Sequence, residues 1–454
     1  MKFDAIILGS GQAGNPLAAS LAKNGQKVAI VEKGKFGGTC VNTGCTPTKS
    51  YIASARRAFV TKNSSNHGVE VQGDVSINLK QIKKRKEEII GESRSGIEKM
   101  LEENEQISVY RGIANFRDNH SLEVNGEVIS AEKIFINTGA RSRIPSEFEN
   151  IHYYTNEGML ELEEIPEHLI IVGGGYIGLE FAQMFRRFGS KVSILDHGSR
   201  LMKQEDEDIS EAIKDILEKE DIKIYFNAKI EEATANKTEV FINIKGSEEK
   251  ISGSHLLVAT GRIPNTDNLG LENTDVELDE KGYIKVNEQL QTSVRHIWAL
   301  GDCNGEGAFT HTSFNDYQIV NDHLFGNSSR KLSDRFTCYA AYIDPPLARV
   351  GMNEKMIKEK GIKAEIASMP MNKISRAKEM GETEGILKIY IEAATKKILG
   401  ASFLGTRADE YIHGIIDAMY AGTPYTTIRD AVHIHPTVSE LIPSMLESPE
   451  KLEL

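Results

Sequence analysis

The sequence predicts an α/β protein in which one strand–helix–strand unit occurs twice, followed by a C-terminal region of a different kind. The repeat is the first observation behind this prediction. Residues 5–32 and 169–196 each contain an apolar run, a glycine-rich turn, a helix-like stretch, a second apolar run and a final acidic residue. The second observation is that from about Ser333 the apolar segments become short and alternate with polar residues, which is typical of an antiparallel sheet.

Length and charge narrow the class of protein. The chain has 454 residues, more than one ordinary hydrophobic core accommodates, so several domains are expected. Its net charge of -12 argues against a surface that binds nucleic acid or anionic membranes. The N-terminus runs from Met1 into an apolar segment at residues 5–8 without a signal-peptide pattern, and no apolar stretch reaches bilayer length. We therefore expect a cytoplasmic protein with no nucleic-acid and no membrane partner.

Each repeated unit carries a glycine fingerprint and an acid at the same distance after its last glycine. The glycines permit a tight turn, close approach of a pyrophosphate and packing of the helix on the strand, while the acid binds ribose hydroxyls. Two copies in register predict two Rossmann-like domains and two bound dinucleotides. The residues are Gly9, Gly11, Gly14 and Glu32 in the first unit and Gly173, Gly175, Gly178 and Asp196 in the second.

The second acid indicates which nicotinamide cofactor is used. Asp196 stands where the 2′-phosphate of NADPH would lie, so charge repulsion favours NADH. His197 and Arg200 lie nearby and act in the opposite direction. NADH is the prediction, and NADPH is the alternative.

Two of the four cysteines, Cys40 and Cys45, lie five residues apart in a glycine-rich segment. A distorted helical turn can bring their sulfurs within bonding distance, and Gly44 and Pro47 permit that distortion. The alternative is a pair of buried thiols or half of a zinc site. Zinc needs further ligands at short spacing, and the nearest histidine, His67, is remote. The pair is therefore predicted to be redox-active, and no metal site is expected.

A third constellation lies near the C-terminus, at His433, His435, Pro436 and Glu440. A His-Pro turn that opens a helix, with a carboxylate one turn later, can orient an imidazole as a general acid/base for a thiol. The same pattern is also found where a helix is simply capped at its start. The residues alone leave these two interpretations open.

The segment from Gly37 to Lys49, with Cys40 and Cys45, resembles the redox-active signature of the class I pyridine nucleotide-disulfide oxidoreductases. This family includes dihydrolipoamide dehydrogenase, glutathione reductase and mercuric reductase, and the resemblance spans essentially the whole chain. It implies that a hydride passes from NAD(P)H through FAD to the Cys40/Cys45 disulfide, and on to a small acceptor. Cys45 would lie against the flavin and Cys40 would face the substrate.

The resemblance also assigns roles to single residues. Lys49 and Glu180 match an ion pair beside the flavin, Asp302 matches an acid that binds the ribityl chain, and Tyr176 matches a tyrosine that covers the nicotinamide pocket. Further residues expected to contact the cofactors are Thr39, Thr138, Gly139, Gly261 and Arg262.

In this family the His435/Glu440 match acts as an acid/base dyad across a dimer interface, which implies a homodimer. The implied domain order is an FAD-binding domain with the cysteine pair and an NAD(P)-binding domain, a return to the first domain, and a C-terminal α+β dimerisation domain. The corresponding ranges are 1–150, 151–265, 266–332 and 333–454.

The acceptor stays open at this stage. Short segments at Lys49, His311, Asp344–Gly351 and Arg376 resemble mercuric-reductase-like bacterial flavoprotein reductases, yet the final seven residues contain no vicinal cysteine pair. A soft metal ion and a disulfide are candidate acceptors, and a dihydrolipoamide dehydrogenase is an alternative function. Two rival functions are a thiol-independent NADH oxidase or diaphorase, and a redox sensor that binds both nucleotides without turnover.

Several residues receive no functional prediction. Cys303 and Cys338 have no motif around them, and His311 is equally compatible with lining the flavin and with packing. Arg56 and Arg57 are interpreted as solvated arginines on a helix surface.

Overall fold

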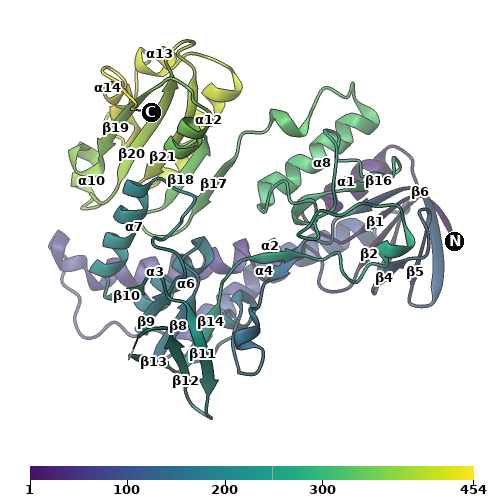
Figure 1. Cartoon of the computed structure of the whole chain (residues 1–454), viewed down its shortest axis with the longest axis horizontal. Helices are drawn as coiled ribbons and strands as arrows, with labels where there is room; N and C mark the ends of the chain where they lie inside the picture. Colours follow the sequence, from purple (N-terminus) through teal and green to yellow (C-terminus); the bar gives the residue numbers. More distant parts are fainter. Residues whose placement is uncertain (248, 454) are drawn as a thin grey trace.

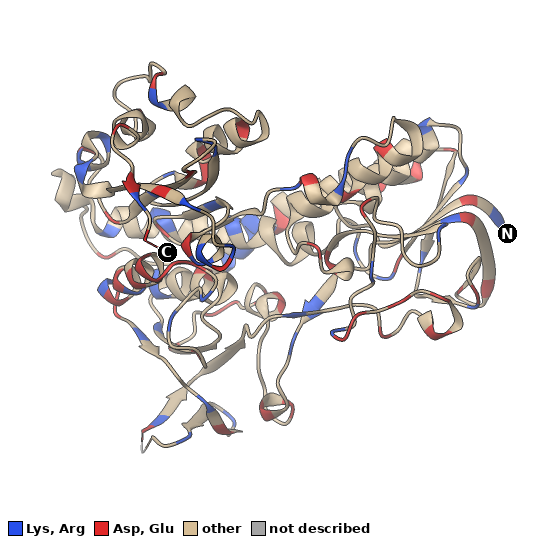
Figure 2. Ribbon diagram, turned by 45° about the horizontal axis from the view of Figure 1, so that its top comes forward, with Lys and Arg blue, Asp and Glu red and all other residues tan. Residues whose placement is uncertain are grey.

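The structure is a computed structural model that describes residues 1–247 and 249–453, and its elements form three lobes (Figure 1). The lobe with the N-terminus lies on the right, the second lies at the lower left, and the third, which carries the C-terminus, lies at the upper left. Acidic and basic residues are interspersed over all three (Figure 2). In the described part of the chain, no helix is long and apolar enough to cross a membrane.

The first lobe contains a mainly parallel sheet with the strand order β3-β2-β1-β6. Helix α1 (Gly14–Lys23) connects β1 to β2, as expected for the first repeated unit. Strand β6 is long enough to pair with β5 (Ser121–Val124) at its start and with β16 (Ile297–Ala299) at its end. The four central strands are β1 (Lys2–Leu8), β2 (Val28–Glu32), β3 (Ile107–Arg111) and β6 (Glu127–Ile136).

The second lobe repeats this topology in the order β10-β9-β8-β14, with all neighbours parallel. Helix α6 (Tyr176–Phe188) connects β8 to β9, and α7 (Glu207–Lys219) connects β9 to β10. Apolar side chains cover both faces of these strands. One face packs against α6 and α7, and the other packs against a three-stranded antiparallel sheet of β11 (Ile230–Ala235), β12 (Val240–Ile244) and β13 (Lys250–Gly253). The strands are β8 (His168–Val172), β9 (Lys191–Leu195), β10 (Ile222–Tyr225) and β14 (His255–Val258).

The third lobe is an antiparallel sheet in the order β17-β18-β21-β20-β19-β22, with short helices packed on it. The alternating segments predicted near residues 386 and 398 form the central antiparallel pair of β20 and β21. The strands are β17 (Cys338–Ala341), β18 (Leu347–Gly351), β19 (Ala364–Pro370), β20 (Ile386–Glu392), β21 (Ile398–Leu404) and β22 (Glu450–Lys451). The predicted fold class is therefore confirmed, whereas the domain boundaries stay a prediction.

Two helices of the first lobe extend toward the other lobes. Helix α3 (Cys45–Lys62) packs against both α4 (Leu79–Glu102) and α6, so it connects the cysteine segment to the second lobe.

The turn after His435 differs from its prediction. A helix does not open at Pro436, because Thr437 donates a hydrogen bond back to the Ile434 carbonyl at 2.8 Å and forms a local turn. Helical structure begins only with the 3₁₀ turn η7 (Ser439–Leu441).

Candidate active site

The acid of the first fingerprint, Glu32, is held by the glycine turn itself. Its Oε2 accepts a hydrogen bond from the backbone N–H of Ser10 at 2.8 Å, and its Oε1 accepts one from Gly34 at 2.7 Å. The carboxylate is therefore fixed at the carboxyl end of β2, where a ribose of a bound dinucleotide would lie.

The acid of the second fingerprint, Asp196, is held in the same way. Its Oδ2 accepts from the N–H of Gly174 at 2.6 Å, and its Oδ1 accepts from Gly198 at 2.6 Å. These donors occupy the same positions relative to the acid as in the first unit. The repeat found in the sequence thus extends to the hydrogen bonds of both turns.

The last glycine of each fingerprint packs against the first. A Cβ on Gly14 would lie 2.3 Å from the carbonyl oxygen of Gly9, and a Cβ on Gly178 would lie 2.1 Å from that of Gly173. Such contacts are impossible, so each helix approaches its strand closely only because these residues lack a side chain.

The middle glycines differ between the two units. A Cβ on Gly11 would lie 2.6 Å from Oδ1 of Asn137, whereas Gly175 faces open space. The Asn137 side chain accepts from the N–H of Gly14 at 3.0 Å and donates to the Leu300 carbonyl at 2.8 Å. Asn137 thus closes the first turn from the end of β6, and sequence reasoning had not singled it out.

Cys40 and Cys45 come together at the start of α3 as free thiols. The hydrogen bond from Cys40, together with weaker contributions from Thr310 and Lys49, lowers the pKa of Cys45 to about 6, against the effect of burial. The same hydrogen bond and burial raise the pKa of Cys40. The Thr310 hydroxyl lies 3.5 Å from the sulfur of Cys45. Cys45 is also the first residue of α3, where the helix dipole stabilises a thiolate.

The predicted ion pair of Lys49 and Glu180 is formed. Lys49 lies one turn after Cys45 on α3, and its Nζ is 2.8 and 2.9 Å from the two carboxylate oxygens of Glu180 on α6. Glu180 is only 3% exposed, so the contact with Lys49 offsets part of the cost of burying this carboxylate. The backbone N–H of Tyr342 donates to Glu180 at 2.9 Å, and Lys49 lies 4.7 Å from the centre of the Tyr342 ring.

Asp302, Arg262 and Tyr176 lie in one neighbourhood. Nε of Arg262 is 3.6 Å from Oδ2 of Asp302 and, within the described residues, is buried without a hydrogen-bond partner. Burial raises the pKa of Asp302, and Arg262 acts in the opposite direction. Burial also raises the pKa of Tyr176, to about 12, and its ring packs 5.8 Å from that of Phe309. A buried donor without a partner beside a buried acid fits a polar bound group at this place.

Among the remaining predicted cofactor residues, Thr138, Gly139 and Gly261 contact segments that connect the first two lobes, whereas Thr39 makes a local contact. The Thr138 hydroxyl donates to the Asn265 carbonyl at 2.9 Å, and the Gly139 carbonyl accepts from the Asn265 N–H at 3.0 Å. The Gly261 carbonyl accepts a hydrogen bond from the N–H of Arg143 at 2.9 Å. Thr39 lies on α2 (Gly38–Asn42), where its carbonyl accepts from the N–H of residue 43. Their contacts to a cofactor stay predictions.

The dyad near the C-terminus is formed within one chain. Nδ1 of His435 lies 2.8 Å from Oε2 of Glu440, with the imidazole 76% exposed and the carboxylate 10% exposed. His433 instead bonds to the Ser439 carbonyl at 3.0 Å, a supporting contact. The neighbouring Ile434 is 81% exposed. Among the described contacts, none joins this dyad to the cysteines of the same chain.

Three residues that had no firm prediction now have clear surroundings. His311 bonds to the Cys338 carbonyl at 2.7 Å and stacks on Phe309, and burial lowers its pKa. Cys303 is fully buried in the first lobe. Arg56 is not simply solvated, because it forms ion pairs with Asp344 and Glu382.

Comparison with known families agrees with this geometry. The model of the pyridine nucleotide-disulphide oxidoreductases matches residues 3–316, and the model of that family's dimerisation domain matches residues 337–446. The chain belongs to the pyridine nucleotide-disulphide oxidoreductase family. It is a flavin-dependent disulfide oxidoreductase that uses FAD and a pyridine nucleotide, and its dimerisation domain supports a homodimer.

Individual relatives span almost the whole chain. The probable pyridine nucleotide-disulfide oxidoreductase RclA of Escherichia coli (strain K12) is 38% identical, over 97% of this chain and 97% of that protein. A mercuric reductase of Staphylococcus aureus is 32% identical, over 96% of this chain and 81% of that protein. A solved Cu(II) complex of the HOCl-induced flavoprotein disulfide reductase RclA from Escherichia coli has a TM-score of 0.89 and 36% identity, covering 98% of this chain and 99% of that one.

Proposed function

We propose that this protein is an NADH-dependent flavoprotein reductase whose Cys40/Cys45 dithiol reduces a small acceptor that binds thiolates, with Cu(II) as the acceptor to test first. The observation that carries this proposal is the environment of Cys45. Its thiol receives hydrogen bonds from Cys40 and Thr310 and lies at a helix N-terminus near Lys49, which favours a thiolate at neutral pH.

Both dinucleotide sites support this function. The close-packed Gly14 and the fixed carboxylate of Glu32 fit the adenosine end of FAD, and the buried Nε of Arg262 beside Asp302 fits a polar part of the same cofactor. FAD, when bound, supplies the chemistry that converts a hydride from the nicotinamide into two electrons for a disulfide. Tyr176, at the start of α6, would cover the nicotinamide pocket between turnovers.

The two thiols have different tasks in this proposal. Cys45 remains the thiolate, stabilised by the hydrogen bond from Cys40 and by Lys49. Cys40 keeps its proton because that hydrogen bond and burial raise its pKa, so it needs a base before it attacks an acceptor. His435, oriented by Glu440 and highly exposed on one subunit, is suited to act as that base on the other subunit of the dimer.

Each candidate acceptor gives a balanced reaction. With a disulfide, Cys40 forms a mixed disulfide and releases one thiol, after which Cys45 attacks Cys40 and releases the second thiol. With Cu(II), the Cys40 thiol and the Cys45 thiolate become a disulfide, two Cu(II) ions become two Cu(I) ions, and one proton leaves. Cu(II) is favoured because a relative of 36% identity was solved as a Cu(II) complex.

The preference for NADH rests on Asp196. Both of its oxygens are bound by backbone N–H groups, so its negative charge is held in place at the ribose position. A 2′-phosphate would meet this charge, whereas a 2′-hydroxyl can donate to it. His197 is exposed and does not form a short ion pair with Asp196, since the atoms are 4.0 Å apart.

The test measures NADH consumption by the FAD-bound protein with one acceptor at a time. The acceptors are Cu(II), lipoamide, glutathione disulfide, Hg(II) and a quinone. Formation of Cu(I) is followed with a Cu(I)-specific chelator. Cys45→Ser should abolish turnover with the preferred acceptor, whereas Cys338→Ser, which removes a thiol that no proposed step uses, should keep it. Turnover with Cu(II) that is equal in wild type and Cys45→Ser would contradict the proposal, and quinone-only activity would favour a diaphorase.

A further inference from the structure

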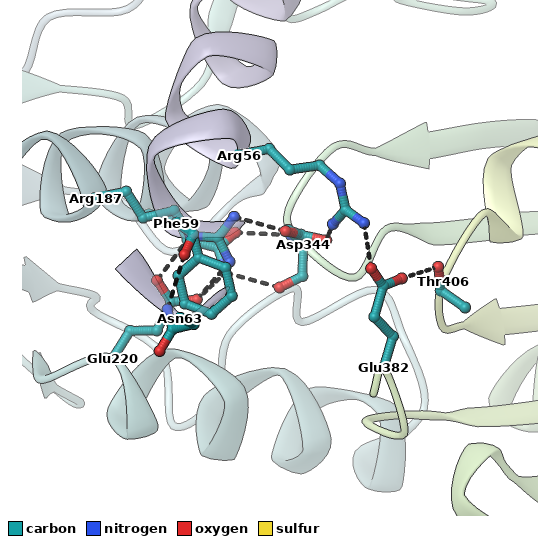
Figure 3. A network of polar contacts seen from close by, with 9 residues as sticks. Arg56, Phe59, Asn63, Arg187, Glu220, Asp344, Glu382 and Thr406 are labelled. Carbon is teal, nitrogen blue, oxygen red and sulfur yellow. Dashed lines mark hydrogen bonds and ion pairs between the residues drawn. The ribbon is translucent and has the colours of Figure 1, made fainter. Parts of the chain in front are cut away.

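The loop between β17 and β18 places one carboxylate between two arginines from different lobes. Figure 3 shows Asp344 with Arg56 on one side and Arg187 on the other. Oδ2 of Asp344 is 2.6 Å from NH1 of Arg187, and Oδ1 pairs with NH1 of Arg56. Arg56 belongs to α3 and Arg187 to α6, so a single side chain joins the two helices.

The same loop is bound along α6 through its backbone. Gln183 accepts from the N–H of Asp344 at 2.7 Å and donates to its carbonyl at 2.8 Å, and Glu180 accepts from the N–H of Tyr342 at 2.9 Å. The positions 180, 183 and 187 form one face of the helix. The loop therefore lies on this face from Glu180 to Arg187.

Helix α3 contacts the loop at matching positions. Lys49 and Arg56 are two turns apart, about 10 Å along the helix, and so are Glu180 and Arg187 on α6. At one end Lys49 pairs with Glu180 beside Tyr342, and at the other end Arg56 and Arg187 share Asp344. The two helices are thus tied together twice by one short loop.

Burial strengthens the ion pairs that Asp344 forms with the two arginines. Arg187 is 5% exposed and Asp344 14% exposed, and Arg187 also pairs with Glu220 at 2.7 Å and lies 3.9 Å from the Phe59 ring. Removing one member leaves a charge in a poorly hydrated place, so the group persists as a unit. Arg56 is 39% exposed and is the member that can be replaced with the least damage.

We propose that Arg56 and Asp344 are positioning residues for the redox pair: they hold residues 342–344 against α3 and α6 and thereby fix the Lys49–Glu180 ion pair beside Cys45. This inference rests on the proposed role of Cys45 as the reactive thiol. When the loop loosens, Glu180 loses the Tyr342 N–H and Lys49 loses the Tyr342 ring. Lys49 then turns toward water, and the thiolate of Cys45 loses part of its stabilisation.

The test is the pH profile of alkylation of Cys45 by iodoacetamide on the reduced, FAD-bound protein. Mass spectrometry with fragment ions separates Cys45 from Cys40, which matters because the two thiols hydrogen-bond to each other. Other charged or polar groups that act on Cys45 are Thr310, Lys49 and Glu180. In wild type the midpoint is expected near pH 6, with alkylation rising above it as the thiolate forms.

Arg56→Gln is expected to raise this midpoint by about one pH unit, since Lys49 would then lie farther from Cys45, and losing a nearby positive charge has an effect of this order. Arg56→Lys should restore most of the wild-type profile. Arg57→Gln is the matched control, because its exposed side chain has the same charge on the same helix and forms no ion pair with the described residues. Asp344→Asn is a second variant that keeps the backbone bonds to Gln183 and should shift the midpoint in the same direction.

The outcomes separate this inference from the proposed function. A wild-type midpoint close to that of an ordinary thiol contradicts the proposed role of Cys45. A low wild-type midpoint that Arg56→Gln leaves unchanged contradicts the positioning role alone, and so does an equal shift in Arg57→Gln. In a Glu180→Gln background the Arg56→Gln shift should vanish; a full additional shift would show that Arg56 acts by another route. If Asp344→Asn fails to fold, Arg56→Gln still decides the question.

Discussion

The two nucleotide turns have the same acid geometry and different middle glycines. Glu32 and Asp196 accept hydrogen bonds from equivalent backbone positions, so both turns hold a carboxylate in place at the position where a ribose is expected. Asn137 closes the first turn over Gly11, whereas Gly175 in the second turn faces open space. The backbone of Ala259 meets Gly173 as that of Asn137 meets Gly9, which makes Ala259 the counterpart of Asn137.

We expect this difference to correspond to two kinds of cofactor use. A turn tied by buried hydrogen bonds to β6 and to residue 300 is suited to a cofactor that stays bound through every turnover. A turn without such a closing side chain is suited to a nucleotide that enters and leaves in each cycle. The repeat thus supplies one scaffold, and we expect the residue after its fourth strand, Asn137 after β6 and Ala259 after β14, to distinguish the resident from the exchanging cofactor.

The largest expected effect is the loss of a different cofactor when the last glycine of each turn is replaced. Gly14→Ala places a Cβ 2.3 Å from the Gly9 carbonyl and should cost about 1–3 kcal/mol, with loss of bound flavin seen in the visible absorbance per chain. Gly178→Ala should instead keep the flavin and raise KM for NADH about tenfold or more. If Gly178→Ala loses the flavin and Gly14→Ala keeps it, the assignment of the flavin to the first turn and of NADH to the second is wrong.

A second effect concerns the closing side chain. Asn137→Ala removes two hydrogen bonds in a buried place and should lower the free energy of unfolding by about 2 kcal/mol, with faster release of flavin on dilution. Thermal unfolding and flavin fluorescence measure the two changes. The reciprocal variant, Ala259→Asn, should keep flavin retention at the wild-type level and slow the exchange of NADH. If Asn137→Ala releases flavin at the wild-type rate, the Asn137 side chain does not hold the flavin, and the proposed difference between the two turns is wrong.

A smaller effect concerns the choice of nicotinamide. Asp196→Asn removes the charge at the second ribose and should lower kcat/KM for NADH about tenfold relative to that for NADPH. Glu32→Gln serves as the matched control, because it changes the first acid and should leave the NADH/NADPH ratio unchanged. A wild-type enzyme with higher kcat/KM for NADPH would overturn this part of the proposal.

The smallest expected effect is that of Gly175→Ala, which should leave the free energy of unfolding almost unchanged. Gly175→Ala adds a methyl group in open space, so the free energy of unfolding should stay within about 0.5 kcal/mol of wild type, whereas Gly11→Ala meets Asn137 and should lower it. Denaturant unfolding of the two variants compares them directly. Equal destabilisation would mean that the second turn is as closely packed as the first.

The features that sequence reasoning predicted are those with a local pattern. The two repeated units, the antiparallel C-terminal sheet and the Cys40/Cys45 segment each depend on residues close together in the chain. The Lys49–Glu180 pair joins distant residues, and only the family resemblance brought it forward. Its formation in the structure agrees with that prediction, although the catalytic role stays to be tested.

The residues that sequence reasoning missed act over long separations. Asp344 of the third lobe meets Arg56 of the first lobe, and nothing near either residue in the sequence indicates the other. Tyr342 contributes a backbone N–H to Glu180, a contact that does not depend on its side-chain type. Thr310 reaches Cys45 because α8 (Thr310–Phe325) begins beside α3. Only tertiary packing brings these groups together.

The most direct test of the central claim is an anaerobic titration of the oxidised, FAD-bound protein with one equivalent of NADH, followed by alkylation and mass spectrometry. Cys40 and Cys45 should be protected from alkylation before NADH is added, and both should become alkylated afterwards, while Cys303 should stay unmodified because it is fully buried. If NADH is consumed and the two cysteines remain unmodified, electrons do not reach this pair and the dithiol mechanism is wrong.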